Sequence, residues 1–393
     1  MLESKKFLIG SGCSYGKVAY SLNQWKEYLN IDDDTIIIDL QEDSQSSEYS
    51  ADSIIYTCNQ LLNNGVNPNN IFVVNEWTEF DRIQYVFPNG TIEESINKEN
   101  SQINTNIYNS NTDEKEYLNK LLNFRNYYFD NNNKMQIKLI DNLCYVNPSH
   151  LCIDDYKNTS FHHWALTFQR HAELLNNEKL IINYLNNILR LQYYLKLKTI
   201  KYNFHFINCQ LSQFTKDTYK NVYHKQVDFY KIENNKFIPN KNAHRDFIKR
   251  LTEKNDVYNI FDSCKSKFDE LDFKNIWVYD KNGYRFGGID EWAFDNLEDF
   301  GYTSAQIKYE EIKHRQFFIP KYNNHPNPIV YFILSKFFLK DCKFINHKEN
   351  SIDEIMKQID IDLNCDNEDG SIIFPSKNTI EQIFRIKMTN KLL

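Results

Sequence analysis

An apolar run that ends in a turn of small residues lies near the N-terminus and constrains the fold most. Run and turn together span residues 7–16, with the letters FLIGSGCSYG. Apolar residues then recur at helical spacing over residues 18–29. This succession of strand, tight turn and helix predicts the first βα unit of an open α/β sheet, in which sites form at the carboxyl ends of strands.

Four interpretations of this turn compete. A phosphate-binding loop is excluded, because residues 12–17 are one residue short of G-x4-G-K and Val18 stands where Ser or Thr would bind magnesium. A dinucleotide-binding turn is supported by the glycines of residues 10–16 and by Asp39, which ends the next apolar run where a ribose-binding acid would lie. A nucleophile turn would expose Ser14 at the strand end. An ordinary βα turn with no chemistry is the fourth interpretation.

The remaining apolar runs alternate between strand and helix patterns. Strands are predicted over residues 6–9, 35–40, 71–75, 202–208 and 276–279, helices over 18–30, 51–62, 161–197, 351–361 and 378–388, and a polar loop over 41–50. This alternation predicts an α/β fold, a three-layer α/β/α sandwich around a parallel sheet with right-handed crossovers.

Two long stretches interrupt the alternation. Residues 83–160 and 210–273 are polar and rich in Asn and Tyr, so we predict two large insertions, the first helical over residues 114–129. The chain then divides into core segments 1–82, 161–209 and 274–345, insertions 83–160 and 210–273, and a helical C-terminal extension 346–393. The insertions would cover a site as a lid or bind a protein partner.

Composition excludes several classes of protein. The 393 residues are 41% hydrophobic and 15% aromatic, enough for a large core, and the net charge of −7 has no basic stripe for nucleic acid. No apolar run approaches the roughly 18 residues of a membrane span, and the N-terminus runs directly into the first strand without a signal peptide. We therefore expect a cytoplasmic protein. The eight cysteines include no C-x-x-C pair, so zinc ribbons and thioredoxin-like chemistry have no support. Free thiols are predicted for a long chain without a secretion signal, and we expect neither a metal nor a cofactor.

Three short blocks, in order along the chain, carry a resemblance to a known family. They are G-C-S at residues 12–14, W-T-x-x-x-R at residues 77–82 and N-x-H-P at residues 323–326, and a G-G-I-D-E-W run at 287–292 precedes the last. Together they resemble the SGNH (GDSL-type) hydrolase superfamily, in the divergent branch common in phages and large DNA viruses. The resemblance covers somewhat over half of the chain and implies a flavodoxin-like sandwich.

The resemblance implies a set of catalytic roles. Ser14 would be the nucleophile and His325 the base that takes its proton. The oxyanion would be held by backbone N–H groups, one of them at Ser44, and by the hydroxyl of Thr78. Ser44 stands where the family has glycine. The alternative interpretation is that Ser44 belongs to a solvated loop and has no role in binding the oxyanion.

Two further residues flank the site by the same resemblance. Trp77 and Arg82 would contact substrate, with Arg82 binding a carboxylate or phosphate group. The alternative role for Arg82 is a structural ion pair with Asp81 or Glu79.

The clearest departure from the family pattern is at the acid that orients the base. Asn323 stands where the family has Asp, and an amide cannot stabilise an imidazolium by charge. The site would then be a Ser–His dyad oriented by a backbone carbonyl, or be completed by Asp290, Glu291 or Asp81, or be inactive. Tyr331, where the viral branch often has a second His, adds to this departure.

The sequence therefore favours a serine esterase or acetylesterase that acts on a small acyl ester or an acylated carbohydrate. The alternative from another class is a catalytically weak or silent protein of the same fold, a structural or binding component of a virion. The second alternative is a dinucleotide-binding protein with its adenosine beside Asp39 and no role for His325.

Overall fold

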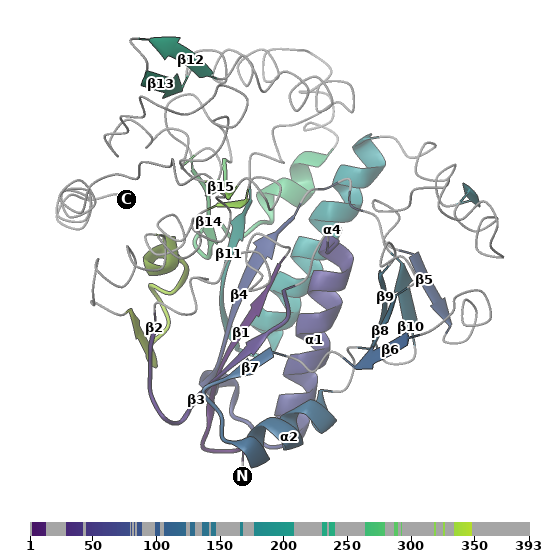
Figure 1. Cartoon of the computed structure of the whole chain (residues 1–393), viewed down its shortest axis with the longest axis vertical. Coiled ribbons are helices and arrows are strands. Elements are labelled where there is room, and N and C mark those ends of the chain that lie inside the picture. The colour runs from purple at the N-terminus through teal and green to yellow at the C-terminus, as the bar shows by residue number, and fades with distance from the viewer. Residues whose placement is uncertain are drawn as a thin grey trace, which may run out of the picture.

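A computed structural model gives the fold of the chain. It describes residues 2–12, 29–41, 45–78, 80, 82, 85–88, 99–102, 106–122, 126–129, 136–140, 143–146, 166–167, 177–207, 230–233, 236–239, 264–279, 287–289, 292, 318–319, 325–326 and 334–347. These residues form a central sheet between helices, a second antiparallel sheet and three two-stranded pairings (Figure 1).

The central sheet has six strands in the order β14-β11-β4-β1-β3-β7. They are β1 (Lys6–Ser11), β3 (Thr35–Asp39), β4 (Ile71–Trp77), β7 (Asn106–Tyr108), β11 (Lys201–Phe206) and β14 (Ile276–Trp277). All neighbours are parallel except β3 and β7. In chain order the parallel strands lie as 2-1-3-4-5. The five predicted strands are confirmed, with ends shifted by a few residues, and so is the α/β class.

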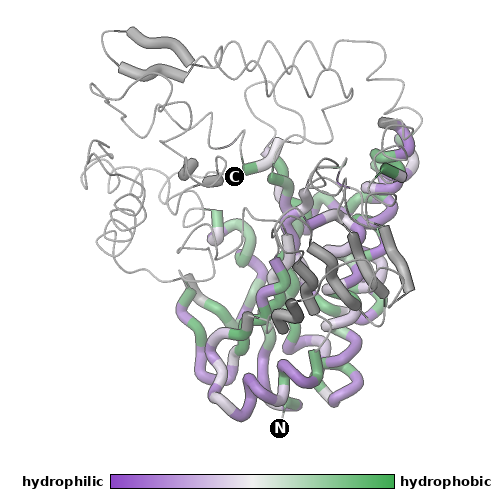
Figure 2. Tube along the Cα trace, turned by 45° about the vertical axis from the view of Figure 1, so that its right-hand side comes forward, coloured by the Kyte–Doolittle hydropathy of each residue, from purple (hydrophilic) through white to green (hydrophobic). Residues whose placement is uncertain are grey.

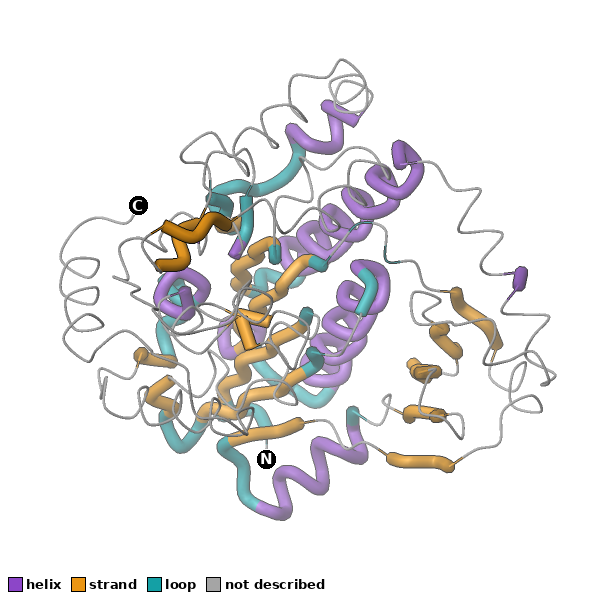
Figure 3. Tube along the Cα trace, turned by 45° about the horizontal axis from the view of Figure 1, so that its top comes forward, coloured by secondary structure: helices purple, strands orange, loops and turns teal. Residues whose placement is uncertain are grey.

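Two long helices lie on one face of this sheet, and a short helical segment lies on the other. Helices α1 (Ser47–Asn63) and α4 (Asn177–Leu197) pack side by side on one face (Figures 1 and 3). Residues 334–342, which we call the cover segment, contain a short helix and lie on the other face. The cover segment is fixed to β11 by a hydrogen bond of 3.0 Å from Asn203 Nδ2 to the carbonyl oxygen of Phe337.

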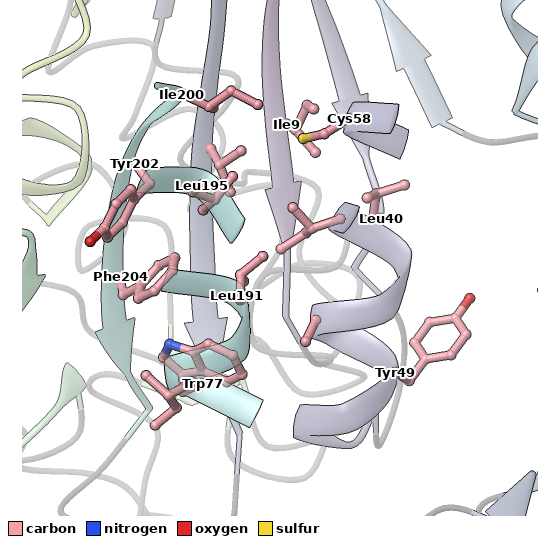
Figure 4. Close-up of a cluster of buried hydrophobic side chains, with 14 of the residues drawn as sticks. Ile9, Leu40, Tyr49, Cys58, Trp77, Leu191, Leu195, Ile200, Tyr202 and Phe204 are labelled. Atoms are coloured by element: carbon pink, nitrogen blue, oxygen red, sulfur yellow. The ribbon is translucent and has the colours of Figure 1, made fainter. Parts of the chain in front are cut away.

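The main core lies between the sheet and helices α1 and α4 (Figure 4). Side chains alternate across a strand, so Val73 and Trp77 of β4 join this core while Phe72 and Val74 are buried on the opposite face. Figure 2 shows hydrophobic stretches along the central strands and mixed colouring along the helices. The pattern of two buried faces explains why the strands read as continuous apolar runs.

Helix α1 begins earlier than the sequence predicted. Its N-cap is Ser46, whose hydroxyl accepts a hydrogen bond from the backbone N–H of Tyr49, so residues 47–50 are helical and the prediction of a loop over 41–50 is wrong there. Serine is a favoured N-cap because its oxygen satisfies an otherwise unpaired N–H. After the helix, Gly65 adopts a φ of +83°, and the 3₁₀ turn Pro68–Asn70 leads into β4.

The predicted helix over residues 18–30 is wrong at its C-terminal end. Residues Leu29–Ile31 form strand β2, which pairs antiparallel with β17 (Ile345–His347). Pairing with a segment more than 300 residues away is a tertiary effect that helical spacing cannot reveal. Residues 18–28 lie outside the described residues.

The described residues of the first insertion lie mostly in β-strands. Strands β5 (Tyr85–Pro88), β6 (Glu99–Gln102), β8 (Asn126–Phe129), β9 (Gln136–Ile140) and β10 (Leu143–Val146) form a sheet in the order β5-β10-β9-β8-β6. The helix predicted over 114–129 is α2 (Thr112–Leu121), so its C-terminal part is a strand instead. A capping box of Asn111 and Glu114 starts α2. Because β7 joins the central sheet, this insertion also extends the core fold.

The second predicted insertion contains the hairpin of β12 (Tyr230–Glu233) and β13 (Lys236–Pro239). Its last residues belong to the main core, since Cys264, Phe268 and Leu271 are buried there. The helices predicted over 351–361 and 378–388 lie outside the described residues. Among the described helices, none combines the length and the apolar character needed to cross a membrane.

Candidate active site

The carboxyl ends of β1 and β4 meet where the strand order of the central sheet reverses, the place where open α/β sheets form ligand sites. Strand β1 ends at Ser11, and Gly12 follows with a φ of +151°. A Cβ atom on Gly12 would lie 2.7 Å from Glu76 Cβ, so only glycine fits this close approach to β4. Ser14 follows two residues later in the sequence, outside the described residues.

A group of fully buried neutral polar side chains lies on the α1 face of this end of the sheet. We call it the switch-point network, and it consists of Ser11, Gln45, Ser50, Asn75 and Thr78. Gln45 Nε2 donates to Ser11 Oγ at 3.1 Å, Ser11 and Ser50 hydroxyls lie 3.0 Å apart, and Ser50 Oγ donates to Asn75 Oδ1 at 2.6 Å. The network thus joins the loop before α1 to the ends of β1 and β4.

The single proton of each hydroxyl fixes the direction of this network. Ser50 gives its proton to Asn75, so Ser11 must donate to Ser50. At the two ends, Asn75 Nδ2 and Gln45 Oε1 are buried without a hydrogen-bond partner among the described residues. Rotating both amides by 180° reverses the chain and again leaves one donor and one acceptor unpaired. In the orientation shown by the hydrogen bonds, the unpaired donor is Asn75 Nδ2 at the end of β4, and native structures rarely leave a buried polar group without a partner.

The three predicted residues at the end of β4 and just after it differ in their surroundings. Thr78 is fully buried and its hydroxyl donates to the carbonyl oxygen of Gln45 at 2.9 Å. Trp77 is also fully buried, and its ring meets Tyr184 and Phe204 edge to face. The prediction that Trp77 contacts substrate does not fit this position, because its side chain is part of the main core. Arg82 is half-buried.

An ionisable pair lies on the opposite face, beneath Gly12. Glu76 and His205 are register partners on β4 and β11, both are buried, and Glu76 Oε2 lies 3.5 Å from His205 Nε2. The His205 ring stacks on Phe338 of the cover segment, with centroids 3.7 Å apart and planes within 6°. Burial lowers the pKa of His205, and the Glu76 carboxylate opposes this by raising it. Because the net shift is downward, the imidazole is neutral at pH 7.

The structure describes only some of the other predicted residues. Ser14, Ser44 and Asn323 lie outside the described residues, and so do the alternative acids Asp81, Asp290 and Glu291 as well as Tyr331. His325 lies in strand β16 (His325–Pro326), whose backbone pairs antiparallel with β15 (Phe318–Ile319). In the G-G-I-D-E-W run, Gly287 forms an isolated antiparallel bridge with Tyr279, and Ile289 and Trp292 are buried.

Sequence reasoning missed the polar residues that the fold gathers here. From the sequence alone, Asn75 and Glu76 end a predicted apolar strand, and His205 lies within another predicted strand. The sequence does carry a signal. Two adjacent polar residues end a central strand that is otherwise apolar, and because side chains alternate, one of them must be buried on each face of the sheet. No group of three or more His, Cys, Asp or Glu side chains suited to a metal ion occurs within the described part of the chain.

Comparisons with protein-family models, with characterised proteins and with solved structures found no match to this chain.

Proposed function

We propose that this chain is a serine ester hydrolase of the SGNH type, with Ser14 as nucleophile and His325 as base. The observation that carries the proposal is the 2-1-3-4-5 order of the parallel strands, which is the flavodoxin-like order. This order puts Gly12 at the switch point, and the G-C-S turn follows from that residue. A nucleophile at this position would stand where such sheets hold their ligands.

The proposed reaction is acyl transfer in two steps. The Ser14 hydroxyl oxygen attacks the ester carbonyl carbon while His325 takes the hydroxyl proton, and the alcohol leaves with that proton. Water, deprotonated by the same imidazole, then cleaves the acyl-enzyme and releases the acid. Backbone N–H groups at the turn and at Ser44 would hold the oxyanion. An acylated carbohydrate remains the proposed substrate class, and Arg82 would bind an acidic group on it.

The side-chain donor to the oxyanion is better supplied by Asn75 than by Thr78. The Thr78 hydroxyl already donates its proton to Gln45, whereas Asn75 Nδ2 has no partner among the described residues. Both side chains come from the end of β4. Assigning this role to Asn75 in place of Thr78 therefore changes the donor but not the strand that supplies it.

The second candidate is a catalytically weak or silent protein of the same fold, serving as a structural component of a virion. Asn323 in place of an orienting Asp favours it, since that change in a serine protease triad slows turnover about 10⁴-fold, or roughly 5 kcal/mol. The dinucleotide alternative fits poorly, because Asp39 is fully buried and one of its oxygens accepts from the backbone N–H of Gln41 at 3.1 Å.

The test is covalent labelling by a fluorophosphonate probe, which reacts with activated serines. We expect a single adduct on Ser14, located by peptide mass spectrometry, and no adduct in Ser14→Ala. Ser4→Ala, which removes an exposed serine near the N-terminus, is the matched control and should label like wild type. A folded wild-type protein that takes no label would overturn the proposal.

A further inference from the structure

Glu76 and His205 connect two parts of the molecule that are distant in sequence. On one side, Glu76 lies against Gly12, the last described residue before the turn of Ser14. On the other side, His205 stacks on Phe338 of the cover segment, which follows the His325-Pro326 block. The contact of 3.5 Å between the two side chains completes a continuous path from β1 to the cover segment.

Close packing on all sides holds this path in place. Both side chains are buried, with Glu76 at 0% and His205 at 1% exposure. The imidazole lies parallel to the Phe338 ring, and Asn203, two residues earlier on β11, binds the backbone of Phe337. Trp277 of β14, the register partner of His205, meets both Phe337 and Phe338. A change in the pair would therefore be felt at Gly12 and at the cover segment together.

We propose that Glu76 and His205 form a positioning pair that couples the end of β1 at Gly12 to the cover segment. In the esterase this pair holds the nucleophile turn and the segment that follows the base in a fixed relation, a role that rests on the proposed function. The coupling itself needs only the contacts of Gly12, Glu76, His205 and Phe338. Neither residue touches substrate in this role.

The pair is also the part of this path that responds to pH. Among the described residues, Glu76 is the charged group whose contact with His205 is direct, while β14 and the cover segment present the aromatic rings of Trp277 and Phe338. Burial lowers the pKa of His205, so the imidazole takes up a proton only at a pH below its ordinary pKa of about 6.5. Protonation places a cation between the carboxylate and the ring, which changes both contacts at once.

Hydrogen exchange of the full chain, followed from pH 8 downward for as long as the chain stays folded, tests the coupling, once corrected for intrinsic exchange rates. In wild type we expect peptides covering residues 7–12 and 334–342 to change protection with the same midpoint. In His205→Gln the pH step should disappear from both peptides, and in Glu76→Gln it should move to lower pH. Phe338→Leu, which keeps an apolar side chain but removes the stacked ring, should uncouple the two peptides.

Thr57→Val is the matched control, because Thr57 is a buried polar residue of α1 on the opposite face of the sheet and should leave both steps in place. Fluorophosphonate labelling of Ser14 is measured on the same samples, with a loss of about 10- to 100-fold expected in His205→Gln and Glu76→Gln. Steps that persist in His205→Gln, or peptides with unrelated midpoints, would overturn the coupling. Absence of Ser14 labelling in wild type would overturn the esterase alone, and the exchange data would still decide the pair.

Discussion

Two adjacent residues of β4 show how the two faces of the central sheet differ at its carboxyl end. Asn75 points to the α1 face and joins hydroxyl and amide groups that carry no charge. Glu76 points to the opposite face and meets His205. One strand can therefore support a site in two ways. The α1 face has a neutral network whose geometry is independent of pH, and the opposite face has an ionisable pair whose contacts change with pH.

The main core on the α1 face is the largest contributor to stability at this edge. Trp77→Ala should lower the free energy of unfolding by about 3–5 kcal/mol, because a fully buried ring leaves a cavity against Tyr184 and Phe204. Urea unfolding followed by circular dichroism measures the change. Leu197→Ala, at a side chain that is 80% exposed, is the control and should change stability by less than about 0.5 kcal/mol. Similar losses in both variants would mean that Trp77 is not a core residue.

The close approach of the two strands at Gly12 comes next in size. Gly12→Ala should cost about 2–4 kcal/mol, because the new Cβ would meet Glu76 and the backbone would adopt a φ that Ala rarely tolerates. Thermal unfolding of the variant beside wild type checks this. A matched substitution, Gly65→Ala, tests a positive φ whose nearest contact is the Glu3 side chain and should cost less. An undisturbed Gly12→Ala protein would refute the close contact between β1 and Glu76.

The neutral network predicts a loss of stability that does not depend on pH. Ser50→Ala leaves the Ser11 hydroxyl and Asn75 Oδ1 without their partner, which should cost about 1–3 kcal/mol. Because none of these groups titrates between pH 5.5 and 7.5, the difference from wild type should be equal at both values. A difference that grows toward low pH would assign a titrating group to this face and remove the contrast between the faces.

The ionisable pair predicts the smallest effect at pH 7 and a pH-dependent one below it. The folded-state pKa of His205 is lowered, so its neutral form contributes stability above the ordinary value of about 6.5, and this stability is lost as the pH falls toward the folded-state pKa. The loss can reach about 1.4 kcal/mol per pH unit in that window.

The measurement is the unfolding free energy of wild type and His205→Gln from pH 7.5 to 5. The difference between the two should shrink as the solution becomes more acidic, since only wild type must protonate a buried imidazole. A constant difference across this range would contradict the assignment of the pH response to His205.

The fold was more predictable from sequence than the site. Strands β1, β3 and β4 are continuous apolar runs, and helix α1 has clear apolar spacing, so local pattern determines them. Strands β2 and β7 depend on distant partners at residues 345–347 and 37–39, and no local pattern indicates those pairings. The same holds for the first insertion, whose strands pair mainly with one another.

For the site, motifs identify residue types in a family pattern but cannot tell which side chains share a face. Thr78 and Asn75 are three residues apart, and only the hydrogen bonds reveal that the first is already engaged and the second has an unused donor. Likewise, Trp77 is part of a motif in the sequence and part of the core in the structure. His205 becomes notable only when β11 lies beside β4.

The most direct test of the central claim is hydrolysis of p-nitrophenyl acetate by wild type, Ser14→Ala and His325→Ala, measured together at pH 7.5 with Ser4→Ala as control. We expect hydrolysis above background by wild type and Ser4→Ala, and a loss of at least about 100-fold in turnover for each of the other two variants, since nucleophile and base act as a unit. Equal rates for wild type and Ser14→Ala would contradict it, and the switch point would then hold a ligand or a structural contact in place of a nucleophile.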